Sequence, residues 1–135
     1  MSTESEAIDN WREMQRVYLS TSSMLDRALQ DGFQLGLSEF EVLDLVAVAQ
    51  GEDCTMRDLV AETPMTQSAL SRVVDRLQKS GMVERSECTF DRRSLFVGIT
   101  RKGRDVHAEA KRAYEALLAS QLAGVSVPAS ASAGN

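Results

Sequence analysis

Residues 65–103 read MTQSALSRVVDRLQKSGMVERSECTFDRRSLFVGITRKG, and the period of the apolar residues changes once along this run. In its first part four apolar residues recur at the spacing of one helix face: Leu70, Val73, Val74 and Leu77. Thr66 precedes them as a hydroxyl cap, and Gly81 follows as a helix-ending residue. Residues 82–88 and 95–100 then alternate with a period of two, which is typical of strands. The run therefore predicts a helix over 66–80 and then a β-hairpin.

The other face of the predicted helix is polar and basic. Its residues are Gln67, Ser68, Ser71, Arg72, Asp75, Arg76 and Lys79. The first turns carry short polar side chains and one arginine, a composition that allows a helix to approach base edges in a major groove. Arg76 and Lys79 lie further along, and we expect them to meet phosphates, together with Arg85 or Lys102.

Two further helices are predicted ahead of this one. Ser38 with Glu41 forms a capping-box pattern, and the apolar body that follows, 42–49, predicts a buried central helix. Thr55 with an acid three residues later begins a short helix that runs to about Glu62. Two short helices joined by a tight turn and followed by a hairpin predict a winged helix-turn-helix over residues 37–100.

Long amphipathic segments flank this region. Apolar residues recur at helical spacing over residues 5–32 and again over 101–123. Residues 124–135, rich in Ala and Ser, are expected to form a flexible tail. The sequence thus predicts a single domain that is mainly α with a small β-hairpin wing, in which the long terminal helices form a dimerisation region.

Charge is distributed unevenly along the 135 residues. Residues 66–104 carry 9 basic and 4 acidic groups, whereas residues 1–65 carry 4 basic and 13 acidic groups, and the whole chain has a formal net charge of −5. A basic segment within an acidic protein indicates a surface that binds a polyanion. The alternative is a solvated helix face whose charge has no partner.

The motifs in this order resemble those of the MarR family of bacterial transcriptional regulators. The matching stretches are Met65–Leu77, Gly81–Arg85, Asp91–Ser94 and Ile99–Gly103, and the resemblance extends over roughly residues 8 to 120. It implies a homodimer on a pseudo-palindromic operator in double-stranded DNA. It also implies repression that is relieved by a small aromatic or lipophilic effector, or by cysteine oxidation.

The resemblance assigns roles to the loop of the wing. Asp91 corresponds to the aspartate that orients an arginine, and Arg93 to the arginine that enters the minor groove, with Arg92 as the second candidate. A carboxylate beside a guanidinium fixes its direction through paired hydrogen bonds. Narrow A·T-rich minor grooves attract such an arginine. The alternative is a charged turn that only keeps the loop in solvent.

The chain departs from the family at its end, because Pro128 and the tail replace a final helix that usually returns to the partner. Dimerisation is therefore expected to rely on the two long helices. The residues concerned are Ile8, Trp11, Tyr18, Tyr114, Leu117, Leu118 and Leu122. The alternative is an intramolecular helix pair, although one small core does not easily cover two long apolar stripes.

An effector site is predicted where the long helices meet the winged region. Its candidate residues are Trp11, Met14, Tyr18, Phe33 and Phe40, with Arg16 as a possible addition. Because Trp11 and Tyr18 lie two turns apart on one face, we hypothesise that a planar aromatic acid binds there. Aromatic residues at helical spacing are also common in plain cores.

Other functions find less support in the sequence. Cys88, near arginines, is a better redox candidate than Cys54, which follows two acids, and both cysteines also fit as inert small apolar residues. The single histidine, His107, is expected on an exposed part of the last helix with no nucleophile nearby, so no enzyme, cofactor or metal site is predicted. No signal peptide or membrane span is visible, which predicts a cytoplasmic protein. The rival function is a winged-helix module that binds protein rather than DNA.

Overall fold

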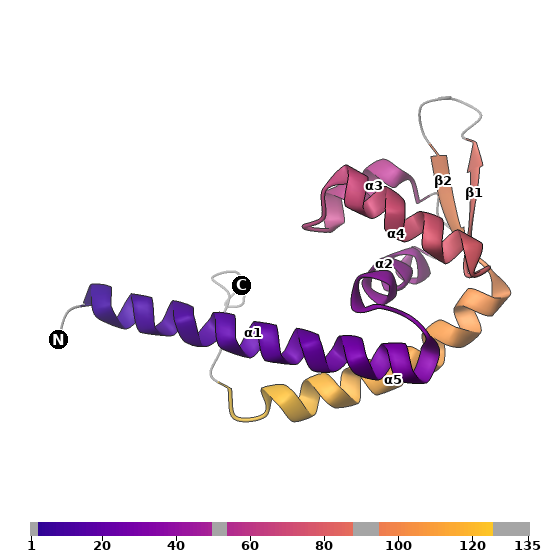
Figure 1. Cartoon of the computed structure of the whole chain (residues 1–135). Helices are drawn as coiled ribbons and strands as arrows, with labels where there is room; N and C mark the ends of the chain where they lie inside the picture. The colour runs from indigo at the N-terminus through magenta and orange to yellow at the C-terminus, as the bar shows by residue number, and fades with distance from the viewer. Residues whose placement is uncertain (1–2, 50–53, 88–94, 126–135) are drawn as a thin grey trace, which may run out of the picture.

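The computed structural model describes residues 3–49, 54–87 and 95–125, which form five helices and one two-stranded antiparallel sheet. In chain order these are α1 (Thr3–Phe33), α2 (Leu37–Val48), α3 (Met56–Glu62), α4 (Gln67–Lys79), β1 (Val83–Glu87), β2 (Leu95–Ile99) and α5 (Arg101–Leu122). Figure 1 shows α1 and α5 side by side, with α2, α3, α4 and the hairpin gathered over one end of the pair. The N-terminal half of α1 extends away from the hairpin. The predicted fold class, mainly helical with a hairpin wing, is confirmed.

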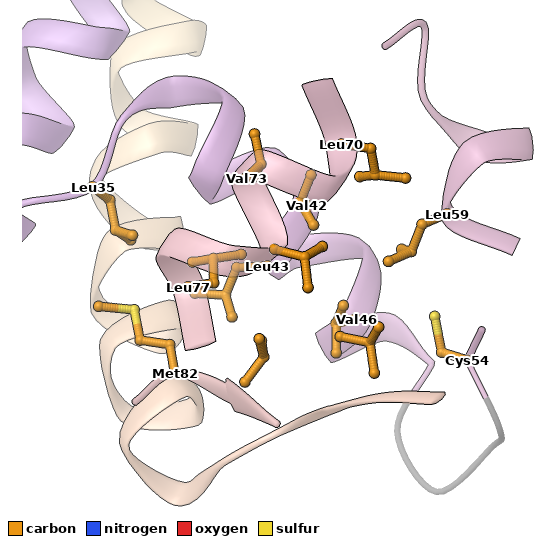
Figure 2. Packing of buried hydrophobic residues seen from close by; sticks show 13 residues of the cluster. Leu35, Val42, Leu43, Val46, Cys54, Leu59, Leu70, Val73, Leu77 and Met82 are labelled. Carbon is orange, nitrogen blue, oxygen red and sulfur yellow. The ribbon is translucent and has the colours of Figure 1, made fainter. Parts of the chain in front are cut away.

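The main core lies between α2 and α4. Leu70, Val73, Val74 and Leu77 of α4 are buried, as their helical spacing predicts. They pack on Val42, Leu43 and Val46 of α2, and Leu59 and Val97 close the core from α3 and β2. Figure 2 shows these side chains converging from the surrounding elements. The predicted role of α2 as the buried central helix is confirmed.

A smaller core joins the long helices to α2. Leu29 of α1, Phe40 of α2 and Ala110 of α5 are buried together, and the Phe40 ring lies 4.6 Å from the ring of Tyr114. These three helices therefore share one buried cluster.

The hairpin is anchored to the rest of the fold on one side. In the register of β1 and β2, Val83 is opposite Ile99 and Glu87 is opposite Leu95. The segment before α3 adds an isolated bridge to β2 between Thr55 and Phe96, and the Val97 amide donates to the Cys54 carbonyl at 2.7 Å. The sequence analysis did not predict this third strand-like segment, because a single bridge leaves no period in the sequence.

Most of the predicted helix ends are confirmed. The hydroxyl groups of Thr55, Thr66 and Thr100 each accept a hydrogen bond from a backbone amide three residues later, at 3.0 to 3.1 Å. Gly81 follows α4 with a φ of +78°, a conformation that favours glycine. These ends depend on local chemistry, which is why they can be read from the sequence.

The predicted capping box of Ser38 and Glu41 is wrong. Helix α2 begins earlier, at Leu37, with Gly36 as its N-cap residue. The Glu39 carboxylate accepts from the Gly36 amide at 2.6 Å, and the Asp26 carboxylate of α1 accepts from the Leu37 amide at 2.8 Å. One local carboxylate and one tertiary contact from α1 therefore satisfy free amides at the start of α2, and the Ser38 hydroxyl is not the cap.

The prediction that His107 lies on an exposed part of α5 is also wrong. Its side chain is only 13% exposed, and its Nε2 atom lies 2.7 Å from the Asp44 carboxylate of α2. The imidazole stacks on Phe40 with 5.8 Å between ring centroids. The histidine thus fastens α5 to α2, a contact that depends on the packing of two helices distant in sequence.

We predict that Gly103→Ala destabilises the fold, although glycine-to-alanine changes inside helices usually stabilise it. A Cβ atom at Gly103 would lie 2.1 Å from the Met82 carbonyl oxygen, so α5 would have to move away from the hairpin. The expected loss in unfolding free energy is about 1–3 kcal/mol, the usual cost of overpacking. Urea denaturation followed by circular dichroism measures it.

The matched control is Gly98→Ala on β2, where a Cβ atom would have no neighbour within 4 Å. This variant should unfold at nearly the wild-type urea concentration. Equal stability of the two variants would contradict the close packing of α5 on the hairpin.

Candidate nucleic-acid interface

The outward face of α4 carries the residues that the sequence assigns to base recognition. Gln67, Ser68 and Arg72 are exposed, and Ser71 is half-buried. The four residues line one shallow depression at the N-terminal end of the helix. The structure therefore brings together the whole predicted base-reading group.

The basic residues of α4 differ in their partners. Arg72 and Lys79 are exposed and form no ion pair with any other residue that the structure describes. The Arg76 Nε atom, in contrast, donates to the Glu39 carboxylate of α2 at 3.2 Å, while 57% of the side chain remains exposed. Arg72 and Lys79 are thus the α4 cations available to a polyanion, and Arg76 is partly committed to the fold.

Two further basic residues, expected at phosphates, contact α4 instead. Arg85 of β1 forms an ion pair with Asp75, and its Nη2 atom lies 3.5 Å from the Ser71 carbonyl oxygen. Lys102 of α5 donates to the Ser80 carbonyl at 2.7 Å, beside the C-terminal end of α4. These contacts hold the hairpin and α5 against α4, so the described geometry favours a structural role for both residues.

The loop of the wing lies outside the described residues. Asp91, Arg92 and Arg93, predicted for the minor groove, and Cys88, the preferred redox candidate, all belong to the segment between β1 and β2. The described strands that flank this segment are antiparallel and stand beside α4 (Figure 1). The predicted positions of these four residues on the wing stay predictions.

Apolar side chains are exposed along one part of α1. Ile8, Trp11, Met14 and Tyr18 are 49–69% exposed, and Leu19, which the sequence analysis did not single out, is 65% exposed. Leu19 continues the helical spacing from Ile8 and Trp11, and that signal could have found it. On α5, Leu122 is 38% exposed, and the other three predicted interface residues are half-buried: Tyr114, Leu117 and Leu118.

A cavity of about 580 Å³ lies between α1, α2 and α5. Of the predicted effector residues, Met14 and Tyr18 line it. Trp11 does not, and Phe33 and Phe40 pack in the core instead. The lining also includes residues that sequence reasoning missed, among them Leu37, Glu41 and Leu118. Sequence periodicity cannot find such a cavity, because its walls come from three helices that meet only in the fold.

The described cysteine is poorly suited to redox chemistry. Cys54 is buried, and burial, followed by the nearby Asp58 carboxylate, raises the pKa of its thiol. A raised pKa reduces the thiolate fraction, which is the reactive form. The structure thus agrees with the sequence reasoning that ranked Cys54 second.

None of the helices that the structure describes is long and apolar enough to cross a bilayer.

Comparison with known proteins finds a family that part of this chain resembles. Residues 33–94 match the sequence profile of the MarR family. A segment of 51 residues is 31% identical to YwhA, an HTH-type transcriptional regulator of Bacillus subtilis (strain 168); the match covers 38% of this chain and only 37% of the relative.

Solved structures share the fold over nearly the whole chain. The transcriptional regulator BldR from Sulfolobus solfataricus superimposes with a TM-score of 0.82 at 28% identity, covering 93% of this chain and 88% of that one. Sco3205, a MarR family transcriptional regulator from Streptomyces coelicolor solved in complex with DNA, also has a TM-score of 0.82, at 24% identity, with 95% and 79% covered. These relatives are described as regulators and not as enzymes, in agreement with the sequence prediction. The profile match over residues 33–94, the partial match to YwhA and the shared fold thus make this chain similar to the MarR family of winged helix-turn-helix transcriptional regulators.

Proposed function

We propose that this chain is a sequence-specific regulator that binds double-stranded DNA through α4 and the wing. One observation carries the proposal. The base-reading group Gln67, Ser68, Ser71 and Arg72 lies on one face of a helix whose opposite face is buried in the core. Such a helix is held rigidly while its polar face is free to enter a major groove. The basic balance of residues 66–104 supports the same partner.

The residues divide into two functions. The base-reading group discriminates base edges, whereas Lys79, with Arg76, contacts phosphates and sets the register of the helix. On the wing, Asp91 orients Arg93 or Arg92 toward the adjacent minor groove. A winged-helix module that binds protein would need neither an unpaired Arg72 nor small polar side chains around it.

We further propose that two copies bind a pseudo-palindromic operator. The exposed apolar side chains of α1, together with Leu118 and Leu122 of α5, form the dimer interface. Burial of these side chains against a second copy removes a large apolar surface from water. Two α4 helices related by a two-fold axis would then reach major grooves about one helical turn apart.

We also propose that the regulator represses its target and that a small aromatic or lipophilic ligand releases it from the operator. A dimer bound to an operator excludes other proteins from the same DNA. We propose that this binding takes place in the cytoplasm. The cavity between the long helices and α2 is a suitable ligand site for such release. One of its lining residues, Leu37, is the first residue of α2 and lies close to the contacts of α2 with α1 and α4. The Leu37 amide is held by Asp26 of α1, and Glu39, two residues later, holds Arg76 of α4. A ligand at Leu37 therefore acts beside the contact that positions α4.

We predict that Arg72→Ala and Lys79→Ala weaken DNA binding in different ways. Loss of a base contact at Arg72 should cost about 1–3 kcal/mol on the operator and relax the preferred sequence, whereas loss of a phosphate contact at Lys79 should weaken all duplexes alike and reduce the salt slope by about 1. Fluorescence anisotropy with a duplex selected from a random pool, measured over a range of salt concentrations, tests both.

Arg112→Ala, an exposed arginine of α5, is the matched control and should bind DNA like the wild type. If wild-type affinity proves insensitive to salt, or if both α4 variants bind like the control, the DNA-binding proposal is wrong. A protein-binding module would then be the better interpretation.

We predict that Trp11→Glu disrupts the dimer. Trp11 is 59% exposed on the apolar part of α1, and a charge there would have to be desolvated in the interface. Hot-spot residues of this kind contribute about 2 kcal/mol or more, so the dimer dissociation constant should rise at least about 30-fold. Sedimentation equilibrium measures it.

Val48→Glu introduces the same charge at an apolar residue that is 73% exposed on α2, outside the proposed interface. This control should keep the wild-type association constant. A wild-type chain that sediments as a 14.8 kDa monomer at all concentrations would overturn the proposed dimer.

A further inference from the structure

The cavity between α1, α2 and α5 has an uneven wall. Apolar side chains such as Met14 and Leu118 form much of it, and its carboxylates are those of Glu13 and Glu41. Among the described residues that line it, none is Lys, Arg or His. A volume of about 580 Å³ falls within the range of sites that enclose small molecules. The cavity therefore combines an apolar interior with negative charge.

The two carboxylates differ in their partners. Glu13 forms an ion pair with Arg16, one turn along α1 at the exposed surface. The Glu41 carboxylate has no ion pair and no side-chain hydrogen bond with another residue that the structure describes. Glu41, an exposed residue, is thus the carboxylate of the cavity that has no protein partner among the described residues.

Two side chains of α5 contact Asp44, the neighbour of Glu41 on α2. Asp44, one turn after Glu41 on α2, lies 2.7 Å from the His107 Nε2 atom and 3.5 Å from the Lys111 Nζ atom. These two side chains of α5 therefore approach Asp44 rather than Glu41. The available basic groups leave the Glu41 carboxylate without a counter-ion.

Burial and neighbouring negative charge both act on two acidic groups of the cavity. Partial burial, and secondly the charge of Asp44, raise the pKa of the Glu41 carboxyl. Burial, followed by the charges of Glu41 and Asp44, also raises the pKa of the Tyr114 hydroxyl. Both shifts have the direction expected of acids that are partly removed from water and lie near other negative charges.

We propose that the ligand of this cavity is a small amphipathic cation, with its apolar body against Leu25 and Leu37 and its ammonium group beside Glu41. This inference rests on the proposed function, because it names the chemical class of the ligand that the regulator senses. An ammonium group supplies the missing counter-ion of Glu41. A carboxylate at the same place would face a like charge with no basic side chain to receive it. The charge is thus opposite to that of the aromatic acid that the sequence hypothesis names.

Three probes that differ only in the head group test the proposal: 4-phenylbutylamine, 4-phenylbutan-1-ol and 4-phenylbutyrate. Isothermal titration calorimetry with the full chain at neutral pH should show the amine binding at least tenfold more tightly than the carboxylate. Glu41→Gln should reduce the affinity for the amine to that for the alcohol. Glu62→Gln, an exposed acid on α3 outside the cavity, is the matched control and should keep the wild-type preference.

A pH series on the wild type needs no substitution. The amine stays protonated below its pKa of about 10. Its affinity should be full well above the raised pKa of Glu41 and should fall as the pH drops toward that value, since protonated Glu41 carries no charge. The other titratable groups that line the cavity are Glu13, Tyr18 and Tyr114. Asp44, one turn after Glu41 on α2, adds a further carboxylate with His107 and Lys111 beside it. Because Glu41→Gln retains all of them, subtracting its pH profile isolates Glu41.

Two results would overturn the inference. The first is 4-phenylbutyrate binding as tightly as the amine. The second is no binding of any probe by a chain that remains dimeric, as expected if the partner fills the cavity.

Operator binding, measured on the same samples, separates the ligand inference from the proposed function. If operator binding fails while the Glu41-dependent amine preference persists, the proposed function is wrong and the ligand class stands. If operator binding holds without that preference, the ligand class alone is wrong.

Discussion

The burial of one face of α4 against α2 is the constraint on which the rest of the molecule depends. Leu70, Val74 and Leu77 are fully buried there, opposite Val42 and Leu43 of α2. Each fully buried side chain of this kind contributes about 1.5–3 kcal/mol. This packing fixes the rotation of α4 about its axis, so the polar residues between the apolar ones face outward. Without it, the base-reading group would not occupy one rigid surface.

The start of α2 connects the other parts of the molecule. Asp26 binds it from α1, and Glu39 at the same place holds Arg76 of α4. Leu37, which lies between these contacts, also lines the cavity. The proposed ligand site, the long helices and the proposed DNA-binding helix therefore meet within one helical turn. Such a short connection allows coupling without any large rearrangement of the core.

Charge serves two purposes in this fold. The basic balance of residues 66–104 suggests many phosphate contacts, but Arg85 and Lys102 bind α4, and Arg76 is partly committed to α2. The contacts of Arg85 and Lys102 with α4 hold the hairpin and α5 in place relative to that helix. The number of basic residues in the segment therefore overstates how many are free for a polyanion.

Local patterns in the sequence determined the elements of the fold. Helical spacing found α1, α4 and α5, a continuous apolar run found α2, and period-two alternation found the hairpin. Hydroxyl caps found the starts of α3, α4 and α5. Each of these signals depends on residues a few positions apart. The sequence likewise identified the outward residues of α4. Only the tertiary structure decided where α2 begins, that His107 contacts Asp44, and that Glu41 lines a cavity without an ion pair to any described residue. These features are contacts between helices far apart in the chain, and their geometry does not exist until the helices pack.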